Sequence, residues 1–347
     1  MNKKYNKFKI ACIGLIGIIL LWAIHPTWTP KINGLNSISE YKTIKINGSK
    51  QQILIRGKDR KNPVIIFIHG GPGCPETPYA RKYQSLLEEN FTVINYDQRG
   101  MGKSFSFFQS YPELSIDTLV TDLIEITDYV PNELKVEKVI LAGHSFGTII
   151  GVKAAALAPE RYYAYIGIGQ VGDFWKGELE ALEYCLSQAK LKGNDKDINK
   201  IEDYRSIVES KEESFPREYV RKYGGAARLI NEGMDMLKGV LFNAEYNFLD
   251  GIKYIKGLSM ADKKLWNEVK NTQLTKEVKT LDIPCYFISG RYDYLTSIGT
   301  AKSYLESIAA PVKDFIVFEK SAHFPQYEEK EEFSSWLKEI CSKLEIK

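Results

Sequence analysis

Short apolar runs alternate with amphipathic segments along most of the chain. The first two runs alternate in polarity around Asn47-Gly48, a dipeptide typical of a tight hairpin turn. Most later runs are almost continuously apolar, as expected of strands buried on both faces of a parallel sheet. The predicted strands cover residues 41–47, 51–56, 64–68, 91–95, 139–142, 163–168, 284–289 and 314–319.

Helical segments separate the later strands, which is the pattern of a doubly wound α/β fold. One helix begins at Ser115, carries its apolar residues on one stripe and is expected to end before Pro131. Further helices are predicted over 79–89, 146–158, 298–308 and 326–344. Together these elements predict a mostly parallel eight-stranded sheet with helices on both faces.

The strand pattern is interrupted over residues 172–280. The segments there are charged and have a helical period, with breaks expected at Gly224-Gly225 and at Gly257. Because the strand pattern resumes afterwards, we expect a helical cap over 172–280, inserted into one α/β core. The core then consists of two parts, over 40–171 and 281–347.

The first 30 residues differ from the rest. Lysines precede an apolar run from Ile10 to Ile24, and the next charged residue is Lys31. Basic residues before an apolar run are typical of a signal anchor. Over 1–30 we therefore expect a single-pass anchor in the cell membrane, with the large α/β domain extracytoplasmic. Secretion after signal cleavage is the alternative.

Composition argues against several classes of function. The formal net charge is only +3, and the chain has no Lys/Arg stripe interleaved with aromatics, so we expect no nucleic-acid partner. The five cysteines show no Cys-x-x-Cys spacing, so the sequence indicates neither a zinc site nor a redox pair. We expect no metal and no cofactor. Their scatter suggests small buried residues rather than disulfides. Cys74 follows a glycine-rich loop, and its role is left open.

The stretch Gly143-His144-Ser145-Phe146-Gly147 lies between a predicted buried strand and a predicted helix. This Gly-x-Ser-x-Gly spacing is typical of a sharp strand-to-helix turn that holds a serine hydroxyl clear of the sheet. Glycine suits the flanking positions because a Cβ would crowd the turn. The positive end of the helix favours negative charge near the serine. Ser145 is therefore the predicted nucleophile.

A serine nucleophile needs a base, and histidine suits that task near neutral pH. Of the four histidines, His25 belongs to the predicted anchor, His69 lies on a glycine-rich loop, and His144 is expected to point away from its neighbour Ser145. His323 directly follows the last predicted strand. Because its loop lies at the carboxyl edge of the sheet, it can reach the serine, and His323 is the predicted base.

The third catalytic group must orient the imidazole and offset its charge. Asp293 follows the seventh predicted strand, so it also lies at the carboxyl edge and is the predicted acid. Asp173 is the runner-up because it follows the neighbouring strand and could also reach His323. The order Ser145, Asp293, His323 is that of α/β-hydrolases.

Negative charge on the substrate oxygen requires fixed hydrogen-bond donors. The backbone amide of Phe146, directly after the serine, is one predicted donor. The glycine-rich stretch that begins at His69 follows a predicted strand and supplies the other donor, through Gly71 with Gly70 as the alternative. A phosphate-binding loop would need a following Lys-Ser/Thr pair, and the sequence has none there.

Five motifs in this order resemble the proline iminopeptidase family of α/β-hydrolases. They are His-Gly-Gly-Pro-Gly at 69–73, Asp-Gln-Arg-Gly at 97–100, Gly-His-Ser-Phe-Gly at 143–147, Gly-x-x-Asp at 290–293, and His323. The resemblance covers about residues 40–345 apart from the insertion. It implies an α/β-hydrolase fold with a helical cap over a serine hydrolase site. It also implies structural roles near the site for His69, Asp97 and Arg99, with the last two paired.

Cap acids in this family commonly bind the free amino group of a peptide. The candidates here are Glu178, Glu232, Asp235 and Glu245, although the Trp-x-x-Trp-Glu element of the family is missing from this cap. We expect an acyl-enzyme mechanism and aminopeptidase-like activity on small peptides or amides. A membrane-associated carboxylesterase or lipase is the alternative. A catalytically silent binding protein on this fold is the alternative of another class.

Overall fold

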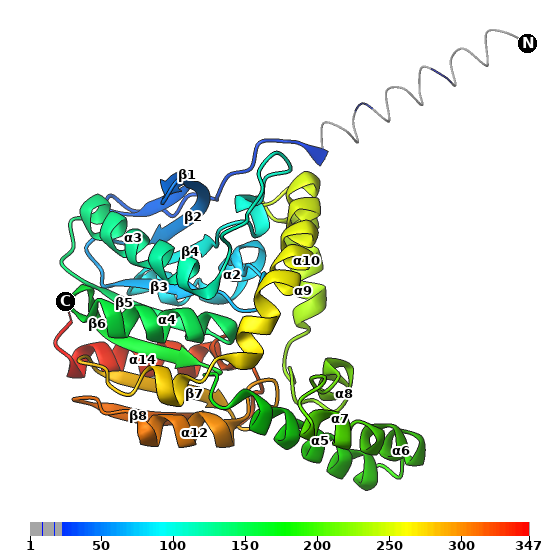
Figure 1. Ribbon diagram of the computed structural model, residues 1–347. Coiled ribbons are helices and arrows are strands. Elements are labelled where there is room, and N and C mark those ends of the chain that lie inside the picture. The colour runs from blue at the N-terminus through cyan, green and yellow to red at the C-terminus, as the bar shows by residue number, and fades with distance from the viewer. Residues whose placement is uncertain (1–8, 10–16, 18–22, 347) are drawn as a thin grey trace, which may run out of the picture.

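A computed structural model describes Lys9, Gly17 and residues 23–346 (Figure 1). Eight strands form one sheet in the order β1-β2-β4-β3-β5-β6-β7-β8, which confirms the predicted sheet. It is parallel from β4 to β8, whereas β2 pairs antiparallel with both β1 and β4. The strands are β1 (Ile38–Ile46), β2 (Ser49–Gly57), β3 (Val64–Ile68), β4 (Thr92–Asp97), β5 (Val139–His144), β6 (Tyr162–Ile168), β7 (Cys285–Gly290) and β8 (Lys313–Phe318).

The antiparallel start of the sheet follows from a local signal. Asn47 and Gly48 both have positive φ values, 43° and 78°, as a two-residue hairpin turn requires. The turn places Ile46 opposite Ser49 and so sets the register of β1 against β2.

Helices cover both faces of the sheet. α3 (Ile116–Leu134), α4 (Phe146–Leu157) and α12 (Ile298–Ser307) pack on one face, and α14 (Lys330–Lys343) packs on the other (Figure 1). Consecutive strand residues point in opposite directions. Ile66 of β3 accordingly belongs to a cluster with side chains of α3, α4 and α12, whereas Ile65 belongs to a cluster with residues of α14.

The predicted end of α3 is wrong. Ser115 caps the helix as expected, because its hydroxyl accepts a hydrogen bond from the amide of Thr118 at 3.1 Å. The helix then continues through Pro131 to Leu134. Proline is tolerated so close to the end because its missing N–H removes one helical hydrogen bond while the following turn closes normally. The amide of Val136 donates to the carbonyl of Pro131 at 3.2 Å.

The insertion between β6 and β7 consists of helices that we call the cap. Figure 1 shows α5 to α8 as a lobe beside the sheet, while α9 and α10 run together along its edge. The cap helices are α5 (Phe174–Leu191), α6 (Asp195–Asp203), α7 (Arg205–Glu209), α8 (Arg217–Lys222), α9 (Glu232–Phe242), α10 (Phe248–Asn271) and α11 (Leu274–Glu277).

The two predicted glycine breaks in the cap have different outcomes. Gly224 follows the end of α8 with a φ of 77°, so the first break is confirmed. Gly257 lies in the middle of α10, so the second prediction is wrong. A Cβ on Gly257 would lie 2.8 Å from the carbonyl oxygen of Gly100. Glycine is present there because α10 packs closely against the loop after β4.

The structure contradicts the predicted location in a membrane. Within the described part of the chain, no helix combines the length and apolar character needed to cross a bilayer. The apolar run from Ile10 to Ile24 is itself shorter than the ~20 residues of a spanning helix. The predictions of a single-pass anchor, an extracytoplasmic location and the membrane as a partner are therefore wrong. Most of the predicted anchor, residues 1–8, 10–16 and 18–22, lies outside the described residues.

Candidate active site

Ser145 lies in a strained turn between β5 and α4. Its φ is 54°, which is unusual for a residue with a side chain, and its amide donates to the carbonyl of Ile168 at 2.9 Å. A Cβ on Gly143 would lie 2.7 Å from the carbonyl oxygen of Gly147, and one on Gly147 would lie 2.1 Å from that of Ile68. Both glycines are therefore required for the turn that exposes the serine.

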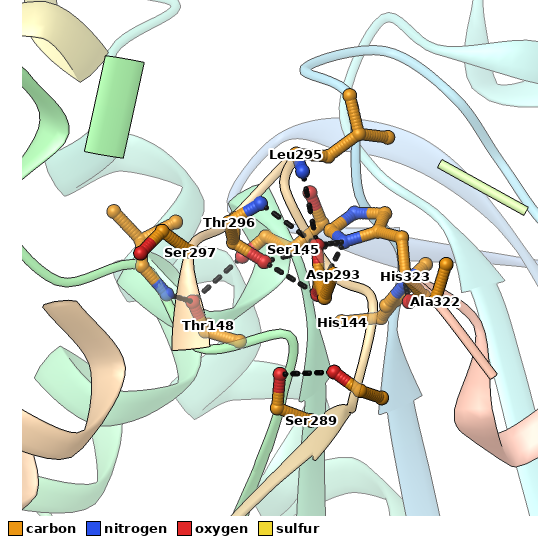
Figure 2. A network of polar contacts seen from close by, with 12 residues as sticks. His144, Ser145, Thr148, Ser289, Asp293, Leu295, Thr296, Ser297, Ala322 and His323 are labelled. Carbon is orange, nitrogen blue, oxygen red and sulfur yellow. Dashed lines mark hydrogen bonds and ion pairs between the residues drawn. The ribbon is translucent and has the colours of Figure 1, made fainter. Parts of the chain in front are cut away.

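His323 and Asp293 form a buried pair at the same edge of the sheet. Nδ1 of His323 lies 2.9 Å from Oδ2 and 3.1 Å from Oδ1 of Asp293. The carboxylate also accepts hydrogen bonds from the amides of Leu295 and Thr296 and from the Thr296 hydroxyl, each at 3.0 Å (Figure 2). These donors fix the carboxylate and, through it, the plane of the imidazole.

Residues that are far apart in the sequence line one cavity of about 490 Å³. Ser145 and His323 both contribute to its wall, as do Gly70, Gly71 and Phe146. Figure 2 shows the serine close to the His323–Asp293 pair. The structure therefore brings together the residues that the sequence predicts for the nucleophile, the base, the acid and the oxyanion donors.

The glycine-rich loop after β3 packs directly against the serine turn. A Cβ on Gly70 would lie 2.9 Å from the Cβ of Ser145. Gly71 has a φ of 122°, and a Cβ there would lie 2.5 Å from the amide nitrogen of Gly73. The absence of side chains allows this backbone to form part of the cavity wall next to Ser145.

A second histidine–carboxylate pair at the cavity was not predicted from the sequence. Nδ1 of His144 lies 2.5 Å from Oε1 of Glu76, and its Nε2 lies 2.9 Å from the backbone carbonyl oxygen of His323. The other oxygen of Glu76 accepts from the Tyr327 hydroxyl. Glu76 and His144 are 68 positions apart, and the Gly-x-Ser-x-Gly motif accepts any residue at position 144. No sequence signal therefore connects the two residues.

Electrostatics favour the charged form of both partners in this second pair. Burial alone would lower the pKa of His144, but the adjacent Glu76 carboxylate outweighs it, so the pKa of His144 is raised above its ordinary value. Burial likewise opposes ionisation of Glu76, yet His144 and the Tyr327 hydroxyl bring the pKa of Glu76 below its ordinary value. Both shifts stabilise the ion pair relative to the neutral pair.

His69 connects two loops at the edge of the sheet. Its Nδ1 lies 3.0 Å from the carbonyl oxygen of Gly70, and its Nε2 accepts from the amide of Gln98 at 3.2 Å. The side-chain amide of Gln98 donates back to the carbonyl of His69 at 2.9 Å. Burial lowers the pKa of His69 to about 4. A neutral ring with one donor and one acceptor nitrogen fits these contacts.

Asp97 and Arg99 do not have the partners expected of them. The Asp97 carboxylate accepts from the hydroxyls of Thr77 at 2.6 Å and Tyr246 at 2.5 Å. Arg99 instead forms two hydrogen bonds with Asp122 of α3, at 2.6 and 2.7 Å. The predicted pairing of Asp97 with Arg99 is therefore wrong, because Asp97 at the end of β4 faces Thr77 and the cap, whereas Arg99 in the following loop faces α3.

The runner-up acid Asp173 lies at the cavity but has another role. Its carboxylate accepts from the amide of Lys176 at 3.0 Å and so caps α5. His323 has Asp293 as its carboxylate partner instead. Cys74 also lines the cavity, and burial raises its pKa to about 11. A protonated thiol is a weak nucleophile, which argues against a reactive cysteine.

The four candidate cap acids fall into two groups. Glu178 and Glu232 line the cavity, paired with Arg217 at 2.5 Å and with Arg221 at 3.3 Å. Asp235 pairs with Lys82 at 2.5 Å and Glu245 with Arg81 at 3.0 Å, and neither is among the residues that line the cavity.

One further cap acid was not predicted as a site residue. Asp262 of α10 is exposed to solvent and lines the cavity. In the sequence it is one of many charged residues on an amphipathic helix, so nothing distinguishes it. No group of three or more His, Cys, Asp or Glu side chains suited to a metal ion occurs in the described part of the chain.

A model of the alpha/beta hydrolase fold family matches residues 63–330. The chain belongs to this family. It is 31% identical to the probable aminopeptidase YbaC of Bacillus subtilis (strain 168), over 87% of this chain and 96% of that relative. It is 26% identical to a proline iminopeptidase of Heyndrickxia coagulans, over 78% and 87% of the two chains. These matches confirm the predicted resemblance and place the protein among the hydrolases of this superfamily.

A solved structure agrees with the fold. The crystal structure of a proline iminopeptidase from Mycobacterium smegmatis matches this hydrolase with a TM-score of 0.63, covering 88% of this chain and 98% of that one. At 17% sequence identity, this likeness shows the fold alone.

Proposed function

We propose that this hydrolase is a serine aminopeptidase that acts on small peptides or related amides through an acyl-enzyme. The observation that carries the proposal is the shared cavity. Ser145 occupies the strained turn in its wall, and His323, which also lines it, is held by Asp293 at 2.9 Å. The aminopeptidase names of the relatives support the choice of substrate and do not favour an esterase, a lipase or a silent binding protein.

In the proposed mechanism, Ser145 Oγ attacks the carbonyl carbon and its proton passes to Nε2 of His323. Nε2 is the nitrogen for this task because Nδ1 faces Asp293. The amides of Gly71 and Phe146 stabilise the negative oxygen of the tetrahedral intermediate. His323 then gives the proton to the leaving amine, and water releases the acyl group from Ser145 by the reverse sequence.

Recognition of a free amino group requires a carboxylate at the cavity. Glu178 is buried and already paired with Arg217, so its charge is compensated. Asp262 is exposed at the cavity wall, and Glu232 forms a longer ion pair with Arg221. We therefore assign ammonium binding to Asp262, with Glu232 as the second contributor.

Labelling with a fluorophosphonate tests the nucleophile. The folded wild-type protein should be labelled on Ser145, and Ser145→Ala should lose the labelling while keeping the wild-type melting temperature. Hydrolysis of aminoacyl-naphthylamides should fall by roughly 10⁴-fold or more in the variant. Folded wild-type protein that resists labelling would remove the enzyme assignment.

Substrates with free and blocked amino groups test the aminopeptidase assignment. A free-amine aminoacyl-naphthylamide should be cleaved faster than its N-acetylated form and faster than short acyl esters. Asp262→Asn should raise KM for the free-amine substrate about 10-fold, the loss of one charged contact of about 1.4 kcal/mol. Asp235→Asn is the matched control, because this cap acid pairs with Lys82 away from the cavity. A preference for blocked amides or esters would contradict the assignment.

A further inference from the structure

One stretch of the cap contacts both loops that carry the proposed acid and base. We call residues 225–229, between α8 and α9, the strap. The carbonyl of Gly225 accepts from the amide of Tyr294, next to Asp293, at 2.9 Å. The carbonyl of Ala226 accepts from the amide of His323 at 3.0 Å. The loop that carries Asp293 and the loop that carries His323 are therefore both hydrogen-bonded to the strap.

Glu328 reinforces this connection from the core side. It ends the short helix α13 (Pro325–Glu328), which begins directly after the His323 loop. Its Oε2 accepts from the amides of Arg228 and Leu229 in the strap, both at 3.2 Å. The same oxygen accepts from the amide of Ala322 at 3.3 Å. A single carboxylate thus joins the cap to the residue before His323.

The strap also contacts the loop of Asp293 through a side chain. The guanidinium of Arg228 lies over the ring of Tyr292, 3.8 Å from its centroid, a cation–π contact. Gly225 packs tightly there, since a Cβ on it would lie 3.1 Å from the Cβ of Tyr294. The strap is therefore fixed against both loops by backbone, carboxylate and aromatic contacts.

We propose that Glu328 is a positioning residue that ties the cap strap to the His323 loop and so keeps His323 aligned with Ser145. The inference rests on the proposed function, because it needs His323 to be the base. Its physical basis is the sensitivity of proton transfer to geometry, since a displacement of about 1 Å can cost 10²-fold in rate.

Glu329 provides a matched control. Its Oε2 accepts from the amides of Lys320 at 3.0 Å and Ser321 at 2.8 Å. It therefore anchors the same loop as Glu328 from the adjacent position, but its hydrogen bonds do not include the strap. Removing Glu329 loosens the start of the loop, whereas removing Glu328 disconnects the loop from the cap.

The kinetic test compares Glu328→Ala, Glu328→Gln and Glu329→Ala on an aminoacyl-naphthylamide, with fluorophosphonate labelling of Ser145 as a second rate. Glu328→Ala should lower kcat and the labelling rate about 10- to 100-fold with KM nearly unchanged. Glu328→Gln retains an oxygen that accepts from amides, so it should recover most of kcat. Glu329→Ala should lower kcat less than about 3-fold. Equal kcat losses in the two alanine variants, or a kcat loss that merely follows melting temperature, would overturn the proposal.

Hydrogen exchange of the intact protein tests the connection between the strap and the His323 loop without relying on activity. In Glu328→Ala, the amides of Arg228, Leu229 and Ala322 should all exchange faster, whereas Glu329→Ala should accelerate only those of Lys320 and Ser321. Faster exchange in Glu328→Ala at the strap amides alone, or at the Ala322 amide alone, would contradict the proposed connection. If wild-type protein lacked hydrolysis and labelling, the proposed function would fail, and the positioning role would fail with it even if exchange showed the tie to exist.

Discussion

Two buried histidine–carboxylate pairs lie side by side at the edge of the sheet, and they differ in what their second ring nitrogen contacts. The rings of His144 and His323 are 4.8 Å apart between centroids. In His144, Nδ1 faces Glu76 and Nε2 faces the backbone carbonyl of His323, so the protein uses both nitrogens. In His323, Nδ1 faces Asp293, and the ring lines the cavity together with Ser145.

This difference in contacts implies different roles for the two histidines. A histidine whose two nitrogens are bound by the protein can hold charge and fix a loop, but it has no nitrogen with which to accept a proton from a nucleophile. His144 contacts the backbone of His323 and therefore supports it. We therefore expect a structural role for His144, next to the serine in sequence, whereas the proposed base lies on a loop 178 residues after Ser145 in the numbering.

The largest effect should separate the two histidines. His323→Gln should lower kcat/KM by about 10⁴-fold or more, because the proposed base is lost. His144→Gln should lower it by about 10-fold, since the loop of His323 loses one support. Steady-state kinetics of both variants, with circular dichroism to confirm folding, measure the contrast. Similar losses in both would show that His144 also takes part in proton transfer.

Substitution of the two carboxylates should show the same contrast, with a larger loss of kcat at Asp293 than at Glu76. Asp293→Asn should lower kcat about 10³- to 10⁴-fold, because an amide can donate to Nδ1 and stabilise the wrong tautomer. Glu76→Gln should cost about 10-fold or less in kcat. The contrast is measured on the free-amine substrate at pH 8. An Asp293→Asn enzyme with near wild-type kcat would transfer the role of the acid to another group.

The pair of Glu76 and His144 should appear in the pH dependence of stability instead. The raised pKa of His144 gives stability that is fully present below about pH 6.5 and is lost as the pH rises through the folded-state value. The lowered pKa of Glu76 gives stability that is present above about pH 4.5 and is lost as the pH falls through its folded-state value.

Glu76→Gln should therefore destabilise the protein by about 3 kcal/mol near pH 6, the scale of a broken buried ion pair. The difference in unfolding free energy between wild type and variant should shrink toward pH 9. Urea unfolding at several pH values measures it. A difference that stays constant from pH 6 to pH 9 would mean that the pair is not ionised in the folded state.

A smaller effect than that of Asp293→Asn is expected at Thr296, whose side chain supports Asp293. The Thr296 hydroxyl donates to Asp293 at 3.0 Å and lies 3.2 Å from Nδ1 of His323. Thr296→Val keeps the shape but removes this contact, so kcat should fall about 10-fold, which corresponds to one hydrogen bond to a charged group. Steady-state kinetics on the free-amine substrate measure the loss. A Thr296→Val enzyme with wild-type kcat would show that this hydroxyl does not support Asp293.

Much of the fold could be predicted from the sequence because its signals are local. Continuous apolar runs marked β3 and β5, and Asn47-Gly48 marked the hairpin, since side-chain period and positive φ are properties of a few neighbouring residues. The boundaries were less predictable. Pro131 lies inside α3 because the end of a helix tolerates a missing N–H. Gly257 lies inside α10 because that helix makes a close backbone contact there.

The candidate site shows the same division. The sequence by itself determined the sharp turn at Ser145, since only that glycine spacing permits it, and topology placed the residues after β7 and β8 at the same edge. Which polar side chains meet was decided by the tertiary structure. Glu76 with His144, Arg99 with Asp122 and the strap with Glu328 are pairings across long sequence separations. Such contacts depend on where whole elements pack, and no periodicity along the chain records that.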